Sequence, residues 1–266
     1  MTLKTIILVL VCLAAPVFAQ WETYHGGADL RGVSETSLPD APQLLWRYNA
    51  GEAVYNTPVS DGERIFFAAK RGQIVAIDLN WEDKGAQASA FAKASADRQP
   101  AWKKSFTRIN DAGAETPLRF EAPLTCAAGT VLAGTTRGTL IALDARTGAE
   151  KWRYETGGVI VGAPNSICTK KAIVIDQSEG ALHCLELATG ALLWKTDGVE
   201  RCDGAPGVGG GRIVFGSCLA ALHVYSAADG THLKDIEIGG DAQVAGGVAV
   251  SGNLVFAGAR DGDLIC

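Results

Sequence analysis

Short apolar runs, each bounded by glycine or polar residues, recur along most of the chain. Arg71–Asp78 and Arg137–Asp144 both read Arg-Gly, then one polar residue, four apolar residues and an Asp. A third copy lies at Glu179–Glu186, and weaker copies lie at Ala221–Tyr225 and Gly262–Cys266. Runs of this length, separated by turn residues, predict many short strands rather than a helical bundle.

The runs recur with a period near 41 residues. Their aligned apolar positions are separated by 66, 42, 40 and 42 residues and are Ile74, Leu140, Leu182, Leu222 and Leu264. The long first interval contains two insertions, one of 16 residues at about 81–100 and one of 9 residues between Trp102 and Pro123, and without them it is 41 residues. The insertion at 81–100 is rich in Ala, Ser, Lys and Asp, which predicts an exposed loop or a marginal helix at a hairpin tip.

Two further signals follow the same period. A Thr-Gly or Asp-Gly pair precedes Trp152, Trp194 and Lys234 by the same spacing. A Pro follows twelve residues after a Trp in three repeats, at Trp46 and Pro58, at Trp152 and Pro164, and at Trp194 and Pro206. Three interlocked signals over five copies indicate a true internal repeat.

A period near 41 residues made of short strands predicts an all-β fold, a β-propeller with four-stranded antiparallel blades. In one unit the predicted strands, from the innermost to the outermost, are Ala163–Ile167, Ala172–Asp176, Ala181–Glu186 and Ala191–Lys195. The propeller domain is expected to cover residues 20–266 and to contain about five blades.

The repeated residue types have structural roles in such a blade. Gly148 and Gly190 lie where a hairpin turn needs a positive φ, which glycine adopts without steric cost. Asp144 can accept hydrogen bonds from the backbone N–H groups of that turn. The Trp rings of the outer strands are expected to lie against the neighbouring blade and to bury a large apolar area there.

Composition and charge exclude several classes of protein. The chain has 266 residues, 32 Gly and 47% hydrophobic residues, and its glycines follow no three-residue period, so it is neither collagen-like nor disordered. Its net charge is −5 and it has no Lys/Arg cluster in the sequence, so nucleic acid is not an expected partner. No second apolar stretch is long enough to form a transmembrane span.

Residues 1–19 are typical of a cleavable signal peptide. They contain Lys4, the apolar stretch Thr5–Leu13 and the small-residue end Val17-Phe18-Ala19. We therefore expect cleavage after Ala19 and export to the periplasm or the cell exterior.

The repeat resembles that of a known family. Ala142-Leu143-Asp144, followed by Thr147-Gly148 and Trp152, is similar to the tryptophan-docking repeat of the pyrroloquinoline-quinone (PQQ) propellers, which include quinoprotein alcohol dehydrogenases and the outer-membrane assembly factor BamB. The segment from Trp21 to Trp46 also resembles the start of secreted PQQ-like propellers. The resemblance implies seven or eight blades, so a C-terminally truncated ring is expected. An alternative is a closed five-bladed ring in which Gln43–Tyr48 completes the last blade.

The resemblance implies either of two kinds of protein. Quinoprotein dehydrogenases use a disulfide between adjacent cysteines, a Trp floor, a Ca²⁺ site and an Asp base, whereas BamB-like propellers bind proteins without catalysis. This chain has no adjacent cysteines and no acidic and amide cluster for Ca²⁺, so no cofactor residue is carried over, and PQQ would need a site supplied by missing C-terminal blades. We also find no Gly-x-Ser-x-Gly, Ser-x-x-Lys, HExxH or zinc-ligand pattern, so no catalytic or metal-binding residue is predicted.

Candidate binding residues lie in loops that propeller geometry places at the mouth of the central channel. Mixed charges there suit protein or peptide contacts, although a solvated face is the alternative. The predicted rim residues are Tyr55, Asn56, Arg71, Arg119, Glu121, Arg137, Arg201 and Asp203, with Lys70 beside them.

Two further hypotheses concern cysteine and histidine. Cys202 and Cys218 flank a predicted hairpin and can face each other, so a disulfide is expected between them in an oxidising compartment. His183 and His223 occupy the same repeat position, which favours a shared structural environment over a catalytic one.

The function expected from the sequence is therefore an exported, non-catalytic protein-binding or assembly scaffold. Two alternatives remain open. One is a fragment of a PQQ-dependent dehydrogenase, and the other is the sensory ectodomain of a larger protein.

Overall fold

The computed structural model describes residues 20–34, 37, 40–42, 44, 46–79, 99–240 and 242–266. The predicted signal peptide and most of the predicted insertion at 81–100 lie outside these residues. Within the described ranges, regular secondary structure consists of strands alone, and no helix there is long and apolar enough to cross a bilayer.

The strands are short, as the apolar pattern predicts. In chain order they are β1 (Val59–Ser60), β2 (Arg64–Ala69), β3 (Gln73–Asp78), β4 (Trp102–Ser105), β5 (Thr107–Ile109), β6 (Glu115–Pro117), β7 (Thr125–Ala127), β8 (Thr130–Gly134), β9 (Thr139–Asp144), β10 (Glu150–Glu155), β11 (Asn165–Ile167), β12 (Lys171–Ile175), β13 (Leu182–Glu186), β14 (Leu192–Lys195), β15 (Gly207–Gly209), β16 (Arg212–Gly216), β17 (Ala221–Ser226), β18 (His232–Glu237), β19 (Ala249–Ser251), β20 (Leu254–Gly258) and β21 (Leu264–Ile265).

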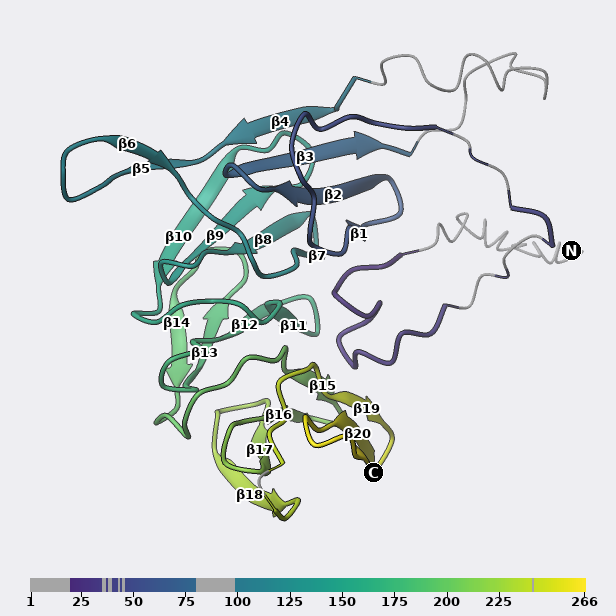
Figure 1. The fold of residues 1–266 in the computed structure, drawn as a ribbon, viewed down its shortest axis with the longest axis vertical. Coiled ribbons are helices and arrows are strands. Elements are labelled where there is room, and N and C mark those ends of the chain that lie inside the picture. Colours follow the sequence, from purple (N-terminus) through teal and green to yellow (C-terminus); the bar gives the residue numbers. More distant parts are fainter. Residues whose placement is uncertain are drawn as a thin grey trace, which may run out of the picture.

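These strands form five successive blades. Blade 1 (β1–β4), blade 2 (β7–β10), blade 3 (β11–β14) and blade 4 (β15–β18) are four-stranded antiparallel sheets in chain order, and blade 5 (β19–β21) has three described strands. Figure 1 shows them following one another in an arc, with the inner strands toward its centre. The predicted β-propeller fold and the strand order of its blades are confirmed.

The core lies between adjacent blades. Between blades 1 and 2, the cluster joins Phe66 and Ile74 to Leu124 and Ile141, and all four side chains have 0% exposure. Comparable clusters fill the next interfaces, so apolar burial between stacked sheets stabilises the arc.

The predicted Trp contacts between blades are present. The ring of Trp102 lies against Gly148 of blade 2, and its Nε1 donates to the carbonyl of Ala145 at 2.9 Å. Trp152 repeats this contact against Gly190 and donates to the Leu187 carbonyl at 2.9 Å. Each Trp therefore joins its own blade to the turn between the third and fourth strands of the next.

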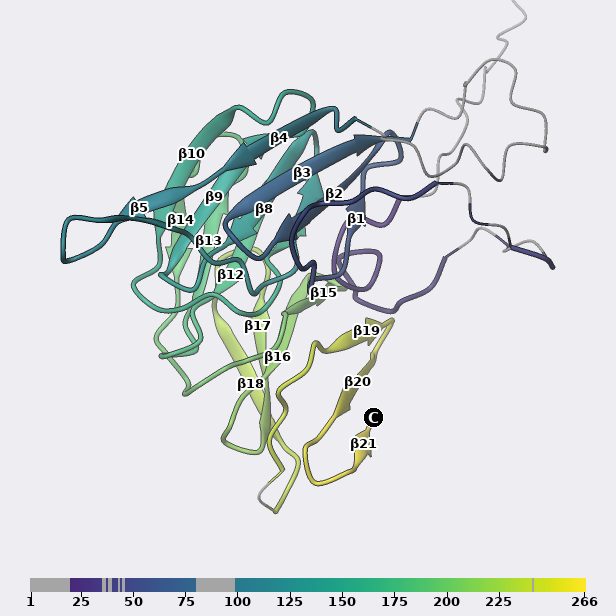
Figure 2. The same cartoon turned by 45° about the horizontal axis from the view of Figure 1, so that its top comes forward.

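The nine-residue insertion after Trp102 forms a hairpin of its own. β5 and β6 pair with each other in a separate two-stranded sheet. Figure 2 shows this hairpin extending from the side of the arc, away from the blade sheets.

The closed five-bladed arrangement is not formed by the described residues. Trp46 and Tyr48 pack against Phe67 and Val75 of blade 1, because their rings cover an apolar face of that blade. In blade 5, the third strand β21 has one hydrogen-bonded neighbour, β20, among the described strands. Trp46 and Tyr48 therefore pack on blade 1 and not beside β21, while Gln43 and Leu45 of the segment expected to complete blade 5 lie outside the described residues.

Residues 21–30, called the axial segment below, lie across the inner strands. Trp21 exchanges two backbone hydrogen bonds with Ser60 of β1, at 2.9 and 2.8 Å, and the Cys126 amide of β7 donates to Glu22 at 2.8 Å. The axial segment is thereby fixed to blades 1 and 2.

The same segment continues over the other three blades. The Val208 amide of β15 and the Nδ2 of Asn165 in β11 both donate to the Ala28 carbonyl, at 2.8 and 2.7 Å. The Val250 amide of β19 donates to the Asp29 carbonyl at 2.8 Å. The axial segment therefore contacts the inner strands of all five blades and satisfies polar backbone groups that would otherwise face the propeller axis.

Candidate functional site

One end of the propeller, called the rim below, is built from two loops of each blade. The turn between the second and third strands donates a backbone hydrogen bond to the loop that leads into an inner strand. The five bonds of this kind are Lys70 to Ala53, Thr136 to Arg119, Gln177 to Val159, Cys218 to Arg201 and Arg260 to Gln243, with N–O distances from 2.7 to 3.0 Å. The repeat thus places two sets of side chains on one surface.

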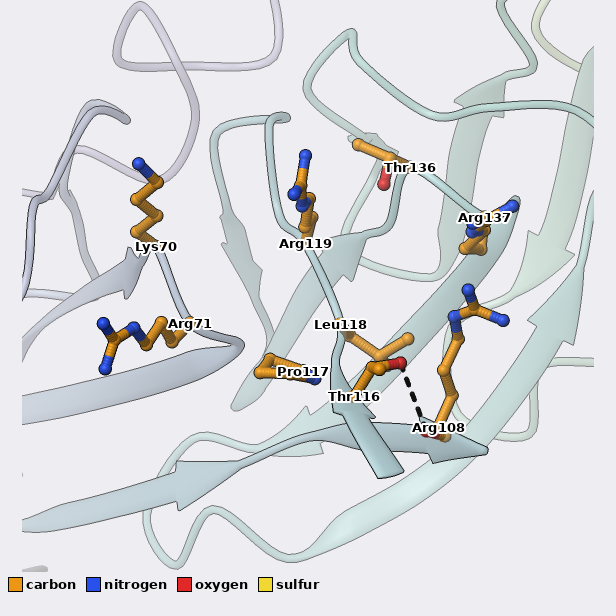
Figure 3. Close-up of a pocket in the computed structure, with 9 residues that line it drawn as sticks. All are labelled: Lys70, Arg71, Arg108, Thr116, Pro117, Leu118, Arg119, Thr136 and Arg137. Atoms are coloured by element: carbon orange, nitrogen blue, oxygen red, sulfur yellow. Dashed lines mark hydrogen bonds between the residues drawn. The ribbon is translucent and has the colours of Figure 1, made fainter. Parts of the chain in front are cut away.

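A cavity of about 640 Å³ opens on the rim beside blades 1 and 2. Its nine lining residues, called the basic pocket below, are Lys70, Arg71, Arg108, Thr116, Pro117, Leu118, Arg119, Thr136 and Arg137 (Figure 3). Five of them are cationic and none is acidic. The pocket therefore has a concentrated positive charge.

Few described groups neutralise these cations. Arg71 Nε lies 3.5 Å from Glu52 Oε1, and Lys70 Nζ lies 5.9 Å from the ring centroid of Tyr55. Within the described ranges, no carboxylate lies within ion-pair distance of Arg108, Arg119 or Arg137. These three guanidinium groups are available to an anionic ligand.

A second charged group on the rim is centred on Asp203. Its carboxylate accepts from Gln177 Nε2 at 2.6 Å and from Arg201 Nε at 2.9 Å, and Arg260 lies at 3.4 Å. Burial opposes ionisation, but the hydrogen bonds from Arg201 and Gln177 and the neighbouring positive charges outweigh it, so the pKa of Asp203 is below its usual value. The Asp203 carboxylate is therefore paired within the chain, and through Gln177 and Arg260 it links the rim loops of blades 3, 4 and 5.

The structure separates the predicted rim residues into three groups. Arg71, Arg119 and Arg137 come together in the basic pocket, and Arg201 and Asp203 form the second group. The other three predicted residues, Tyr55, Asn56 and Glu121, do not line the pocket.

Of these three, one has a clear structural role. Asn56 Nδ2 donates to the carbonyls of Phe120 and Ala122, at 2.9 and 3.1 Å, and so joins blade 1 to blade 2. Tyr55 is exposed beside Lys70, and Glu121 is exposed on the next loop.

Three residues of the rim were not predicted from the sequence, namely Arg108, Gln177 and Arg260. Arg108 lies in the nine-residue insertion, which has no counterpart in other repeats. Gln177 and Arg260 occupy the same turn as Lys70 and Arg137, so the repeat alignment itself contained the signal for them.

The predicted disulfide is not formed in the structure. Cys202 and Cys218 are both free thiols. Cys202 is buried and its Sγ donates to the Glu200 carbonyl at 3.2 Å, and burial raises its pKa to about 12, with a smaller contribution from Cys218. Their pairing in the oxidised protein stays a prediction.

Ser217, His223 and Asp235 have hydrogen-bond distances like those of a catalytic triad. Ser217 Oγ lies 2.8 Å from His223 Nε2, and His223 Nδ1 lies 2.8 Å from Asp235 Oδ1. However, Ser217 has 0% exposure, and its hydroxyl also accepts from the Leu219 amide at 3.1 Å. This hydroxyl closes a turn and is not accessible to a substrate.

Blade 3 builds the same network from different residues. Asp176 takes the place of Ser217, accepting from the Glu179 amide at 2.8 Å, and its other oxygen lies 3.3 Å from His183 Nε2. His183 Nδ1 lies 3.0 Å from the Tyr154 hydroxyl of blade 2. Both histidines therefore hold a turn to a strand, which confirms the prediction of a shared structural environment.

Burial of His183 gives a testable pH dependence. Desolvation lowers the pKa of His183 below its ordinary value and outweighs the opposing effect of its hydrogen bond to the Asp176 carboxylate. As the pH falls, the imidazole of His183 is therefore protonated in the unfolded chain at a higher pH than in the folded chain. Neutral His183 makes its full contribution to stability above about pH 6.5, and this contribution is lost as the pH falls below that value. Between pH 7 and pH 5, the free energy of unfolding measured with urea should fall more steeply for the unmodified protein than for His183→Gln. The difference in slope should be up to about 1.4 kcal/mol per pH unit. Equal slopes would show that His183 does not titrate between the two states.

The described residues do not fit a quinone bound among their inner strands. The axial segment forms hydrogen bonds with backbone groups of the inner strands that face the axis. Leu30 of this segment packs there against Ala163 and Ala205. The described part of the chain also contains no group of three His, Cys, Asp or Glu residues able to hold a metal ion.

Comparison with known proteins supports the fold and the repeat. A family model described as "Outer membrane protein assembly factor BamB" matches residues 84–167. BamB from Shewanella oneidensis is 28% identical over 159 residues, covering 59% of this chain and 37% of that protein. The chain thus spans little more than a third of the length of this curated relative.

Solved structures show the same architecture. BamB from Moraxella catarrhalis superimposes with a TM-score of 0.61 at 19% identity, over 83% of this chain and 60% of that one. Quinohemoprotein alcohol dehydrogenase from Comamonas testosteroni gives a TM-score of 0.66 at 17% identity, over 93% and 47% of the two chains. These likenesses show that the chain has the β-propeller fold of BamB and of the quinoprotein alcohol dehydrogenases, and the family match over residues 84–167 adds a similarity to BamB in the repeat itself.

Proposed function

We propose that the chain is an exported, non-catalytic propeller that binds other proteins as an assembly scaffold, as the name of its BamB relatives describes for them. The signal-peptide pattern at 1–19 supports export to the periplasm. In this proposal the rim binds a protein or peptide partner, and the assembly role needs no cofactor.

The rim is the observation that carries this proposal. The turns of five blades gather there, and the basic pocket has three guanidinium groups without a described carboxylate partner. The axial segment meanwhile covers the inner strands, where quinoprotein dehydrogenases would need space for their cofactor. Charged groups on an open surface suit reversible contacts with another protein.

Complementation tests the assembly role. In Shewanella oneidensis cells lacking their own BamB, export of this chain should raise the amount of folded outer-membrane proteins. The variant Arg119→Glu/Asp203→Arg, with both changes on the rim, should restore less. Arg146→Glu/Glu186→Arg makes the same charge changes as a control, because both residues are exposed at the opposite end of blades 2 and 3, Arg146 in the turn after β9 and Glu186 at the end of β13.

The quinoprotein alternative predicts different results. If PQQ with Ca²⁺ raised the melting temperature of the purified chain and supported dye-linked alcohol oxidation, the scaffold proposal would be overturned. Equal complementation by the rim variant and its control would remove the rim from the proposed interface.

A further inference from the structure

The cations of the basic pocket come from separate parts of the chain. Lys70 and Arg71 lie in the turn after β2, Arg108 lies on β5, and Arg119 and Arg137 belong to blade 2 and its approach. In Figure 3, Lys70 and Arg71 are on one side of the pocket, Arg108 and Arg137 are on the other, and Arg119 is between them. Bringing like charges together is unfavourable unless an anion joins them.

Backbone contacts fix the walls that carry these charges. The Phe106 amide donates to Gly72 at 2.8 Å, and the Leu118 amide donates to Phe106 at 2.9 Å, so the β5–β6 hairpin is held at its base against the turn after β2. Gly72 has a φ of +71°, and a Cβ there would lie 2.5 Å from the Phe106 carbonyl, so a glycine is needed for this close approach. On the other side, the Thr136 amide donates to Arg119 at 3.0 Å. The pocket is therefore organised before a ligand arrives.

The charge of the pocket is opposite to that of the chain. The whole chain has a net charge of −5, whereas the pocket lining contains five cations and no carboxylate. A long polyanion, such as nucleic acid or an anionic membrane, would extend beyond the pocket and meet the acidic remainder of the surface. A short anionic segment would contact the pocket alone.

The lining also indicates what kind of short anion fits. Arginine forks bind carboxylates through paired hydrogen bonds. Pro117 and Leu118 add apolar lining, and the ring of Tyr55, which is 75% exposed, lies beside Lys70. A volume of about 640 Å³ accommodates a few side chains. Carboxylates next to apolar side chains are the chemistry of an acidic peptide.

We propose that the basic pocket binds an acidic segment of a partner protein, a stretch with several Asp or Glu side chains beside apolar ones. This inference rests on the proposed scaffold function and names the chemistry of its partner. Arg119 and the Arg108–Arg137 side receive the carboxylates. The β5–β6 hairpin, which has no counterpart among the other described strands, supplies part of the specificity.

Peptide binding by the purified mature chain tests this proposal. The probe is a fluorescein-labelled hexapeptide of four Glu and two Leu, measured by fluorescence anisotropy at 50 mM NaCl. Arg108→Glu and Arg137→Glu should each weaken binding by about tenfold or more, because each replaces an attraction by a repulsion. Lys234→Glu, an exposed residue of β18 on blade 4, makes the same charge change and should alter binding less than about twofold.

Several outcomes would overturn the proposal. They are no peptide binding by the unmodified chain, equal losses in all three variants, and tighter binding to phosphatidylserine vesicles or oligothymidylate than to the peptide. Unchanged circular dichroism and urea midpoints in the variants exclude unfolding as the cause of a loss. If the chain restores outer-membrane assembly but does not bind the peptide, this inference fails and the scaffold proposal stands; the reverse result refutes the scaffold proposal alone.

Discussion

Replacing Gly190 by alanine is expected to lower the free energy of unfolding by about 3 kcal/mol, as measured by urea denaturation. Gly190 has a φ of +74°, and a Cβ at this position would lie 2.6 Å from Cδ2 of Trp152. The substitution therefore adds backbone strain of about 1–2 kcal/mol and also moves the Trp ring out of the contact between blades 2 and 3. The intrinsic fluorescence of Trp152 in the folded variant should also differ from that in the unmodified protein, because the surroundings of its ring change.

Gly211→Ala is the matched control for this substitution. Gly211 has the same φ of +74°, but nothing lies within 4 Å of the Cβ that alanine would add. Its cost is therefore the backbone strain alone, about 1–2 kcal/mol. Similar losses in both variants would mean that the Trp contact contributes little, and that the repeated Gly serves the turn rather than the interface.

The repeat allowed the blades to be predicted because each blade uses the same local chemistry. The Asp144 turn, the positive φ of Gly148 and the apolar runs are separate short-range signals, and all three agree on one hairpin. Agreement between local signals is what makes a fold readable from sequence. The spacing of Trp152 and Gly190 then predicts the contact between blades, because neighbouring blades are related by the same period.

Contacts that differ from one blade to the next were less predictable, because each depends on which side chains happen to lie within hydrogen-bond distance. Trp194 lies against Gly230 like the other docking residues, yet its buried Nε1 has no hydrogen-bond partner among the residues that the structure describes. The carbonyl at the matching position, of Ala227, instead accepts from Lys171 Nζ at 3.4 Å. A period aligns residue types, but it does not show which donor reaches a shared acceptor.

The candidate site shows the same limit. Arg71, Arg119 and Arg137 could be assigned to the rim because blade topology fixes which loops lie there. Arg108 could not, because it lies on the inserted β5–β6 hairpin, which is held through the bond from the Leu118 amide to the Phe106 carbonyl, and the repeat offers no aligned residues for this insertion. The path of the axial segment was likewise not predicted, since its contacts join residues far apart in the sequence without repetition.

Leu30→Ala is expected to lower the free energy of unfolding by about 3 kcal/mol, because it leaves a cavity between the axial segment and the inner strands. Leu30 is 2% exposed and packs against Ala163 and Ala205, although its φ of +55° is unfavourable for a residue with a side chain. Burial of the side chain offsets this strain, so the packing of Leu30 determines whether the segment stays on the axis. Urea denaturation measures the loss, with Val33→Ala, at a residue 66% exposed just beyond the segment, as the control.

Hydrogen exchange distinguishes local loosening from global destabilisation in the Leu30 variant. The amides of Val208 and Val250 donate to the carbonyls of Ala28 and Asp29, so they should exchange faster as soon as the axial segment leaves the inner strands. If these two amides alone lose protection, the segment is a separate unit covering a propeller that is stable without it. If the amides of β8 and β12 lose protection equally, the axial segment is part of the cooperative core, because it links blades that have few other contacts across the axis. Unchanged stability and exchange would contradict the packing role of Leu30, and would leave its positive φ without a compensating interaction.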